Sequence, residues 1–100
     1  MSRYLLSPAA RADILEASRY GDATFGVAQT DLYFADLDRA MQLIAEFPTM
    51  ARKRTGFRPP VRIHHHGSHY IVYTALKDHV RIVRVLSDQV DLGRHLRRIY

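Results

Sequence analysis

The feature that most constrains the fold of this chain is an apolar stripe with helical spacing between residues 33 and 47. Its members are Tyr33, Leu37, Ala40, Ile44 and Phe47, separated by four, three, four and three positions. This spacing places all five side chains on one face of an α-helix. The following residue is a proline, which predicts that the helix ends there. So broad a stripe needs another surface to cover it.

A second helix is expected before this one. After a short apolar strand at residues 3–6, Ser7 is a good N-cap and Pro8 suits the first helical position. The helix then extends to about Tyr20, and Gly21-Asp22 and Gly26 mark the turn into the next helix. Because the connection is so short, the two helices should lie antiparallel as a hairpin.

The second half of the chain supplies the cover for the helices. Three segments alternate between side chains of different polarity and are rich in β-branched residues, which predicts three strands: residues 61–66, 69–75 and 79–86. Gly67-Ser68 is a two-residue hairpin loop, and glycine at its first position suits a type II′ turn. Lys77-Asp78 makes the next tight connection. The three strands should form an antiparallel meander.

These elements predict an α+β fold: an N-terminal strand, an antiparallel helix hairpin, a three-stranded antiparallel sheet and a short C-terminal helix from Val90 to about Arg98. The hairpin should cover one face of the sheet in a two-layer sandwich. A chain of 100 residues suffices for one modest core and is too short for two. We therefore expect a single domain over residues 1–100.

Composition narrows the class of protein. Hydrophobic residues make up 47% of the chain, a globular value that argues against intrinsic disorder. The absence of cysteine excludes a disulfide framework and a thiolate metal site. No N-terminal stretch has the pattern of a signal peptide, and no apolar run reaches the about 20 residues that span a bilayer. We expect a soluble, cytoplasmic protein with no membrane contact.

The chain is basic, with 15 Lys and Arg residues against 10 Asp and Glu residues and a net charge of +5. Such a balance favours an acidic partner, either nucleic acid or an acidic protein, and is equally compatible with a solvated surface. The cluster Arg52, Lys53, Arg54, Arg58 and Arg62 follows the second helix and leads into the sheet. It suits contact with phosphate or acidic groups, or a solvated loop and strand edge.

Histidines gather around the Gly67-Ser68 loop. In the predicted register His66 lies opposite His69, so His64, His66 and His69 share one sheet face. Three imidazoles on one face suit zinc or copper, but no nearby carboxylate or cysteine completes the ligand set. We therefore predict a structural or surface role for these histidines and no bound metal.

Arg81 and Arg84 interrupt the last strand of the sheet. Because side chains alternate along a strand, the two arginines should point to opposite faces. One then needs a partner in the helix layer, and the other lies on the open face beside Tyr73 and His69. An Arg–Tyr–His surface suits RNA cleavage by general acid–base chemistry, and equally a protein-binding groove. The chain has no Ser-His-Asp order, glycine-rich phosphate loop or paired-carboxylate motif, and we predict no cofactor.

The order and spacing of many short motifs together resemble the ParE branch of the ParE/RelE toxin superfamily, from residue 3 to about residue 96. The matching pieces are Tyr4-Leu5-Leu6-Ser7-Pro8-Ala9-Ala10, Asp13-Ile14, Tyr20, Gly26, Ala28, Tyr33, Leu37, Pro48, Arg58, His69-Tyr70-Ile71-Val72-Tyr73, Ile82-Val83-Arg84-Val85-Leu86 and Asp91. One departure is Ala17, where the family usually has a large apolar residue, and it predicts a shallower core.

The resemblance implies a toxin of a type II toxin–antitoxin system that inhibits DNA gyrase and is neutralised by an acidic ParD-like antitoxin. With that antitoxin it represses its own operon, and it reaches operator DNA only through the antitoxin. In this family the antitoxin lays an amphipathic helix and an extended tail over the helix hairpin and the sheet. The candidate residues for contact with the antitoxin or the target are Arg52, Lys53, Arg54, Arg58, Arg62, Arg81, Arg84 and Arg94.

Two alternatives come with the superfamily. One is a RelE-type, ribosome-dependent mRNA endoribonuclease that uses Arg84, Tyr73 and His69. Such enzymes use several Lys and Arg residues with a C-terminal Tyr or His, whereas the region after Leu86 supplies no basic or aromatic group until Arg94 and His95. The same region departs from the ParE pattern, because ParE-like chains usually have a His-x-Arg segment where this chain has Ser87-Asp88-Gln89. The non-enzymatic interpretation is therefore favoured. The other alternative is a non-toxic corepressor partner of the antitoxin.

Overall fold

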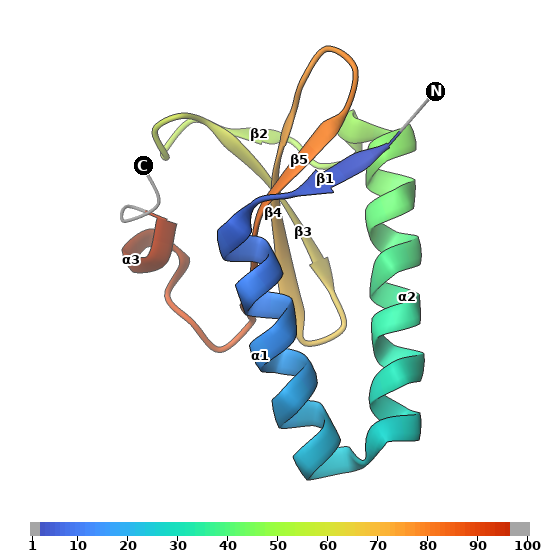
Figure 1. Cartoon of the computed structure of the whole chain (residues 1–100). Coiled ribbons are helices and arrows are strands. Elements are labelled where there is room, and N and C mark those ends of the chain that lie inside the picture. Colours follow the sequence, from blue (N-terminus) through green and yellow to red (C-terminus); the bar gives the residue numbers. More distant parts are fainter. Residues whose placement is uncertain (1–2, 97–100) are drawn as a thin grey trace.

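Figure 1 shows the elements of a computed structural model, which describes residues 3–96. In chain order they are β1 (Tyr4–Leu6), α1 (Pro8–Phe25), α2 (Val27–Glu46), the 3-10 turn η1 (Pro48–Met50), β2 (Lys53–Arg54), β3 (Val61–His66), β4 (His69–Ala75), β5 (Val80–Ser87) and α3 (Leu92–Leu96). The predicted α+β class is confirmed, and the helix hairpin packs on a sheet. The predicted C-terminal helix is present over residues 92–96, and its last two residues, 97 and 98, lie outside the described part.

The sheet has five strands in the order β1-β5-β4-β3-β2. Its centre is the predicted antiparallel meander, in which His66 pairs with His69 across the Gly67-Ser68 loop. Gly67 has a φ of 57°, and none of the described non-glycine residues has a positive φ, which agrees with the predicted type II′ turn. Two edge strands extend the meander, because β1 pairs parallel to β5 and β2 pairs antiparallel to β3.

The first helix of the hairpin is longer than predicted, whereas the second ends where expected. α2 ends at Glu46, just before Pro48, as expected. α1, however, continues through Gly21 to Phe25, so the turn predicted at Gly21-Asp22 is wrong. Gly26, also predicted in the turn, is the glycine that makes it, with a φ of 88°. Gly21 has a packing role instead: a Cβ there would lie 2.7 Å from Oγ1 of Thr30, so the absent side chain lets the two helices approach closely.

Both faces of the sheet are covered. The helix-facing core includes Leu37 and Ile44 of α2, which pack with Tyr73 and Ile82 of the sheet. A second, smaller cluster covers the opposite face, where Leu96 of α3 packs with Val61, Ile63, Val72, Val83 and Leu86. The expected two-layer sandwich with an open face therefore has a partial third layer. Within the described residues, no helix is both long enough and apolar enough to cross a membrane.

Ser7, the residue before α1, hydrogen-bonds to the edge of β5 just beyond the end of β1. The backbone N–H of Ser7 donates to the carbonyl of Ile82 at 2.9 Å, and its Oγ donates to the carbonyl of Val83 at 2.7 Å. The same Oγ accepts from the N–H of Ala10 at 2.9 Å, which confirms the predicted N-cap. The pairing of β4 with β5 shifts its register between Val72 and Tyr73. Along this edge of the sheet, β1 covers the first half of β5 and α1 is held beside its C-terminal half.

Candidate binding cleft

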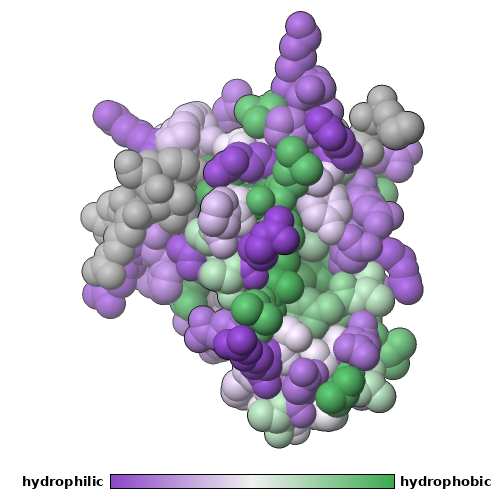
Figure 2. Space-filling view, viewed as in Figure 1, coloured by the Kyte–Doolittle hydropathy of each residue, from purple (hydrophilic) through white to green (hydrophobic). Residues whose placement is uncertain are grey.

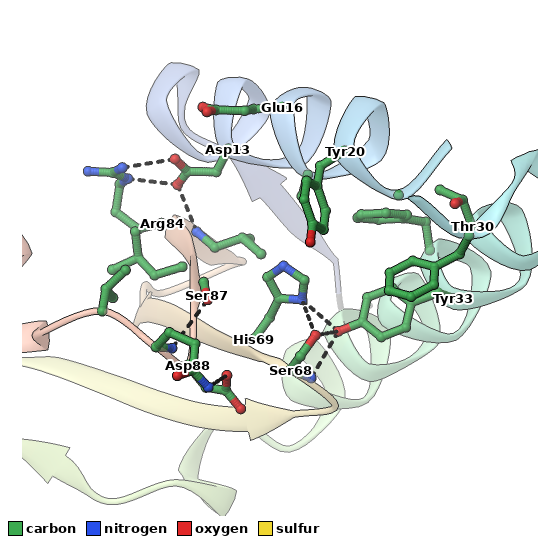
Figure 3. Close-up of a pocket in the computed structure, with 18 of the residues that line it drawn as sticks. Asp13, Glu16, Tyr20, Thr30, Tyr33, Ser68, His69, Arg84, Ser87 and Asp88 are labelled. Atoms are coloured by element: carbon green, nitrogen blue, oxygen red, sulfur yellow. Dashed lines mark hydrogen bonds and ion pairs between the residues drawn. The ribbon is translucent and has the colours of Figure 1, made fainter. Parts of the chain in front are cut away.

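A cleft of about 810 Å³ opens between α1, the first half of α2, the start of β4 and the end of β5 (Figure 3). The segment that follows β5 forms its remaining wall. The lining residues from the helices are Asp13, Glu16, Ala17, Tyr20, Gly21, Phe25, Gln29, Thr30, Tyr33 and Phe34. Those from the sheet and the C-terminal segment are Ser68, His69, Arg84, Val85, Leu86, Ser87, Asp88, Gln89, Val90 and His95. The cleft therefore joins residues far apart in the sequence.

One wall is built on an ion pair between Asp13 of α1 and Arg84 of β5. The guanidinium donates through Nε and Nη2 to the two carboxylate oxygens, at 2.7 and 2.8 Å. Asp13 also accepts the backbone N–H of Val85 at 3.0 Å, so one carboxylate holds both the arginine and the strand edge. The hydrogen bonds with Asp13 raise the pKa of Arg84. Because both side chains are largely buried, this pair fixes α1 against β5 rather than leaving a free cation.

The floor of the cleft is built on Tyr33 and His69. The Tyr33 hydroxyl lies 2.6 Å from Nδ1 of His69 and accepts the backbone N–H of Ser68 at 3.2 Å. Burial lowers the pKa of His69, so the neutral imidazole predominates near pH 7. The Tyr33 ring also passes so close to Gly67 that a Cβ there would lie 2.8 Å from the hydroxyl. The β3–β4 turn is therefore anchored to α2.

The mouth of the cleft is apolar and uncovered. Tyr20 is 66% exposed and Phe25 is 65% exposed, and their rings meet edge to face with centroids 6.4 Å apart. Tyr20 points from α1 into the cleft in Figure 3. Ala17 lines the same wall with a half-buried side chain, so its small size leaves space in the cleft. Figure 2 shows hydrophobic side chains gathered along the helices, flanked by hydrophilic ones. Aromatic side chains beside an unfilled apolar cleft are typical of surfaces that bind proteins.

The segment after β5 is a compact turn tied to the β3–β4 hairpin. The backbone N–H of Asp88 donates to the carbonyl of Ser68 at 2.9 Å. The Asp88 carboxylate lies 3.2 Å from Nε2 of His65, and this hydrogen bond lowers the pKa of Asp88. The N–H of Gln89 donates to Oγ of Ser87 at 3.2 Å. The stretch Ser87-Asp88-Gln89 therefore organises the wall of the cleft.

The structure brings together two of the three residues considered for acid–base chemistry. Arg84 and His69 both line the cleft. Tyr73 does not, because its side chain is fully buried in the helix-facing core and its hydroxyl donates to the carbonyl of Pro48 at 2.7 Å. The expectation that Tyr73 lies on an open sheet face is wrong. Its hydroxyl serves to anchor η1.

Among the eight predicted basic contact residues, Arg84 is the one that lines the cleft. Arg62 donates from Nη1 to the carbonyl of Ala51 at 2.6 Å and supports the chain before β2. Arg54 is half-buried. The remaining five are exposed: Arg52, Lys53, Arg58, Arg81 and Arg94. Arg81 and Arg84 do diverge from the same strand as predicted, one to solvent and one to the helix layer.

The histidines do have nearby carboxylates, contrary to the sequence-based expectation. Nε2 of His66 lies 2.9 Å from the carboxylate of Asp36 on α2, and His65 contacts Asp88. The rings of His64 and His66 stack with centroids 6.4 Å apart. Within residues 3–96, however, no three His, Cys, Asp or Glu side chains converge as a metal ion requires. These contacts tie the β3–β4 hairpin to α2 and to the segment after β5.

Sequence reasoning missed Asp13 and Tyr33 as site residues. Asp13 is separated from Arg84 by 71 positions, and nothing in a single sequence pairs them. Tyr33 was assigned to the core stripe, but it lies half-buried at the edge of that stripe. Its hydroxyl was the available signal, because a tyrosine at a core boundary usually finds a hydrogen-bond partner.

The architecture has a counterpart among solved structures. The structure is similar to a chain of a solved structure described as the chromosomal ParDE TA system from P. aeruginosa, with a TM-score of 0.72. The match covers 87% of this chain and 96% of the other at 13% identity, so it establishes the fold alone.

The sequence identifies the family. Residues 4–92 match the family described as the ParE toxin of the type II toxin–antitoxin system parDE. Toxin ParE1 of Mycobacterium tuberculosis is 35% identical over 96 residues, covering 95% of this chain and 98% of the relative. Toxin ParE1 of Caulobacter vibrioides is 32% identical over 96 residues, covering 96% and 99%. The chain belongs to the ParE toxin family.

Proposed function

We propose that this chain inhibits DNA gyrase in the bacterial cytoplasm by binding it, without catalysis of its own. We further propose that an acidic ParD-like antitoxin neutralises it by filling the cleft. Membership of the ParE toxin family supports both statements as expectations for this chain.

The observation that carries the non-enzymatic proposal is the separation of the three groups a ribonuclease would use. Tyr73 is committed to the carbonyl of Pro48 inside the core. Arg84 is held by both oxygens of Asp13. His69 remains in the cleft, with Nδ1 bonded to a tyrosine hydroxyl. General acid–base catalysis needs its groups within hydrogen-bond reach of one substrate position, and this arrangement argues against that.

The cleft supports the antitoxin proposal through its shape and chemistry. An amphipathic helix could bury its apolar side against Tyr20 and Phe25, whose exposed rings lack a cover among the described residues. A stable complex of this kind buries more than about 1,200 Å² in total. The net charge of +5 favours an acidic partner by long-range attraction. The proposed antitoxin is therefore apolar on one side and acidic on the other.

Expression in a bacterial host separates the proposed function from its alternatives. The chain is expressed alone and with the product of the open reading frame upstream of its gene, and growth, DNA-damage response and mRNA integrity are scored. We expect growth arrest with a DNA-damage response, intact mRNA and rescue by the co-expressed partner. Size-exclusion chromatography of the co-expressed pair should show one stable heteromeric species.

Each alternative gives a different result in the same experiment. Cleaved mRNA without a DNA-damage response would support the RelE-type endoribonuclease and contradict the proposal. A stable complex with no toxicity of the free chain would support the corepressor. Separate elution of the two proteins at micromolar concentration would exclude the proposed antitoxin interaction.

A further inference from the structure

Charge is unevenly distributed along the chain. Residues 47–77 contain no Asp or Glu and carry Arg52, Lys53, Arg54, Arg58, Arg62 and Lys77. The rest of the chain contains the other nine of the 15 basic residues and all 10 acidic residues, so it carries a formal charge of −1. The surplus positive charge of the protein therefore resides in the segment that forms β2, β3 and β4.

The fold concentrates five of these cations at one edge of the sheet. Lys53 of β2 pairs directly with Arg62 of β3, and β2 is the last strand of the sheet. Arg58 lies in the loop that joins the two strands. We call Arg52, Lys53, Arg54, Arg58 and Arg62 the β2 edge. Within residues 3–96, none of the five forms an ion pair with a carboxylate.

The β2 edge also lacks the anchors that protein interfaces use. Between Met50 and Leu76, no described large hydrophobic side chain is exposed, and Phe57 packs into the second core. Protein–protein binding energy is concentrated in buried aromatic and apolar anchors, whereas interfaces with DNA are polar and strongly positive. The composition of this edge therefore fits a phosphodiester backbone better than an acidic protein.

The position of the β2 edge leaves it accessible when the cleft is filled. The cleft is walled by β5, and β2 lies three strands away in the order β5-β4-β3-β2. An antitoxin seated in the cleft would leave the opposite edge of the sheet free. Both partners of the proposed function, gyrase and an operator-binding antitoxin, hold duplex DNA.

We propose that the β2 edge binds the phosphate backbone of double-stranded DNA without reading its sequence, so that the toxin contributes its own DNA contacts to a larger complex. This departs from the expectation that operator DNA is reached only through the antitoxin. The choice of DNA over RNA rests on the proposed function. The binding itself rests on the charge of the edge and on the exposure of Arg52, Lys53 and Arg58.

The test is fluorescence anisotropy of a labelled 20-base-pair DNA duplex with the purified full chain between 50 and 200 mM salt. Each phosphate contact contributes a slope of about −0.9 to the dependence of log K on log salt concentration. Replacing Arg52→Ser and Lys53→Ser together should reduce the slope by about 1.8 and weaken binding at least about tenfold at 100 mM salt. The matched control is Arg11→Ser with Arg19→Ser, two exposed arginines of α1 whose loss changes the net charge equally.

The control variant should bind DNA with an unchanged slope. Equal weakening by both variants would show a net-charge effect and overturn the proposal, as would an unchanged slope in the β2-edge variant. Tighter binding of a duplex RNA of the same sequence, or of a poly-glutamate competitor, would assign the edge to another partner. No gyrase or antitoxin is present, so failure here is distinct from failure of the proposed function.

Discussion

The contact between Gly21 and Thr30 makes a sharp prediction about how α1 and α2 pack. Alanine in a helix interior is ordinarily more stable than glycine by about 1 kcal/mol. At this position an added Cβ would lie 2.7 Å from Oγ1, 3.0 Å from Cγ2 and 3.4 Å from Cβ of Thr30. Overpacking of this kind costs about 1–3 kcal/mol, so Gly21→Ala should lower the free energy of unfolding by about 1 kcal/mol.

Replacing Thr30 with alanine should reverse the sign of the effect of Gly21→Ala on the free energy of unfolding. Thr30→Ala removes the two closest atoms and leaves a contact of 3.4 Å, which is ordinary van der Waals separation. It also removes a buried hydroxyl that has no hydrogen-bond partner among the described residues. In the Thr30→Ala background, Gly21→Ala should therefore stabilise the protein by about 1 kcal/mol, the helix-propensity gain. The coupling energy between the two positions is then about 2 kcal/mol.

Urea denaturation followed by circular dichroism gives the four free energies of this double-mutant cycle. Each variant should unfold with the wild-type dependence on urea concentration, which shows that only stability has changed. If Gly21→Ala stabilises both backgrounds equally, the two helices do not approach as described, and the assignment of Gly21 to packing is wrong.

Three further predictions concern the cleft and its supports. Asp13→Asn should destabilise the fold by about 1–3 kcal/mol in urea denaturation, because it breaks the charge pairing that holds Arg84, whereas the exposed Glu16→Gln should have little effect. Burial lowers the pKa of His64 and His69 below 6.5, so their contribution to stability is present above pH 6.5 and lost as the pH falls through the lowered values. The urea midpoint should accordingly fall between pH 7.5 and pH 5. Ala17→Trp should fill the cleft and weaken antitoxin binding in titration calorimetry at least about tenfold, whereas Ala12→Trp on the exposed face of α1 should not.

The elements predicted correctly are those encoded by neighbouring residues. The stripe that ends before Pro48, the Ser7 cap and the Gly67-Ser68 turn each depend on a few adjacent positions. The elements missed depend on partners elsewhere in the chain. Gly21 reads as a helix stop in isolation, but its contact with Thr30 makes it a helix interior position.

The site was less predictable than the fold for the same reason. Strand alternation predicts that one of Arg81 and Arg84 needs a partner without saying which, and the pairing of Arg84 with Asp13 requires the packing of α1 on β5. Strand alternation alone could not say which face of the sheet carries Tyr73, because the covering of the second face by α3 was not foreseen. The location of the basic cluster at a strand edge was predictable, since it follows directly from the order of the elements.

The central claim is that this toxin binds gyrase and has no ribonuclease activity. The most direct measurement is a gyrase supercoiling assay with the purified chain, alone and with its antitoxin, run beside an mRNA cleavage assay on translating ribosomes. The account predicts that supercoiling is inhibited, that the antitoxin restores it, and that mRNA stays intact. Arg84→Ala should weaken inhibition in step with binding, and Arg11→Ala, at an exposed position of α1 outside the cleft, serves as its control. Ribosome-dependent mRNA cleavage that is abolished by Arg84→Ala in a folded protein would contradict the account.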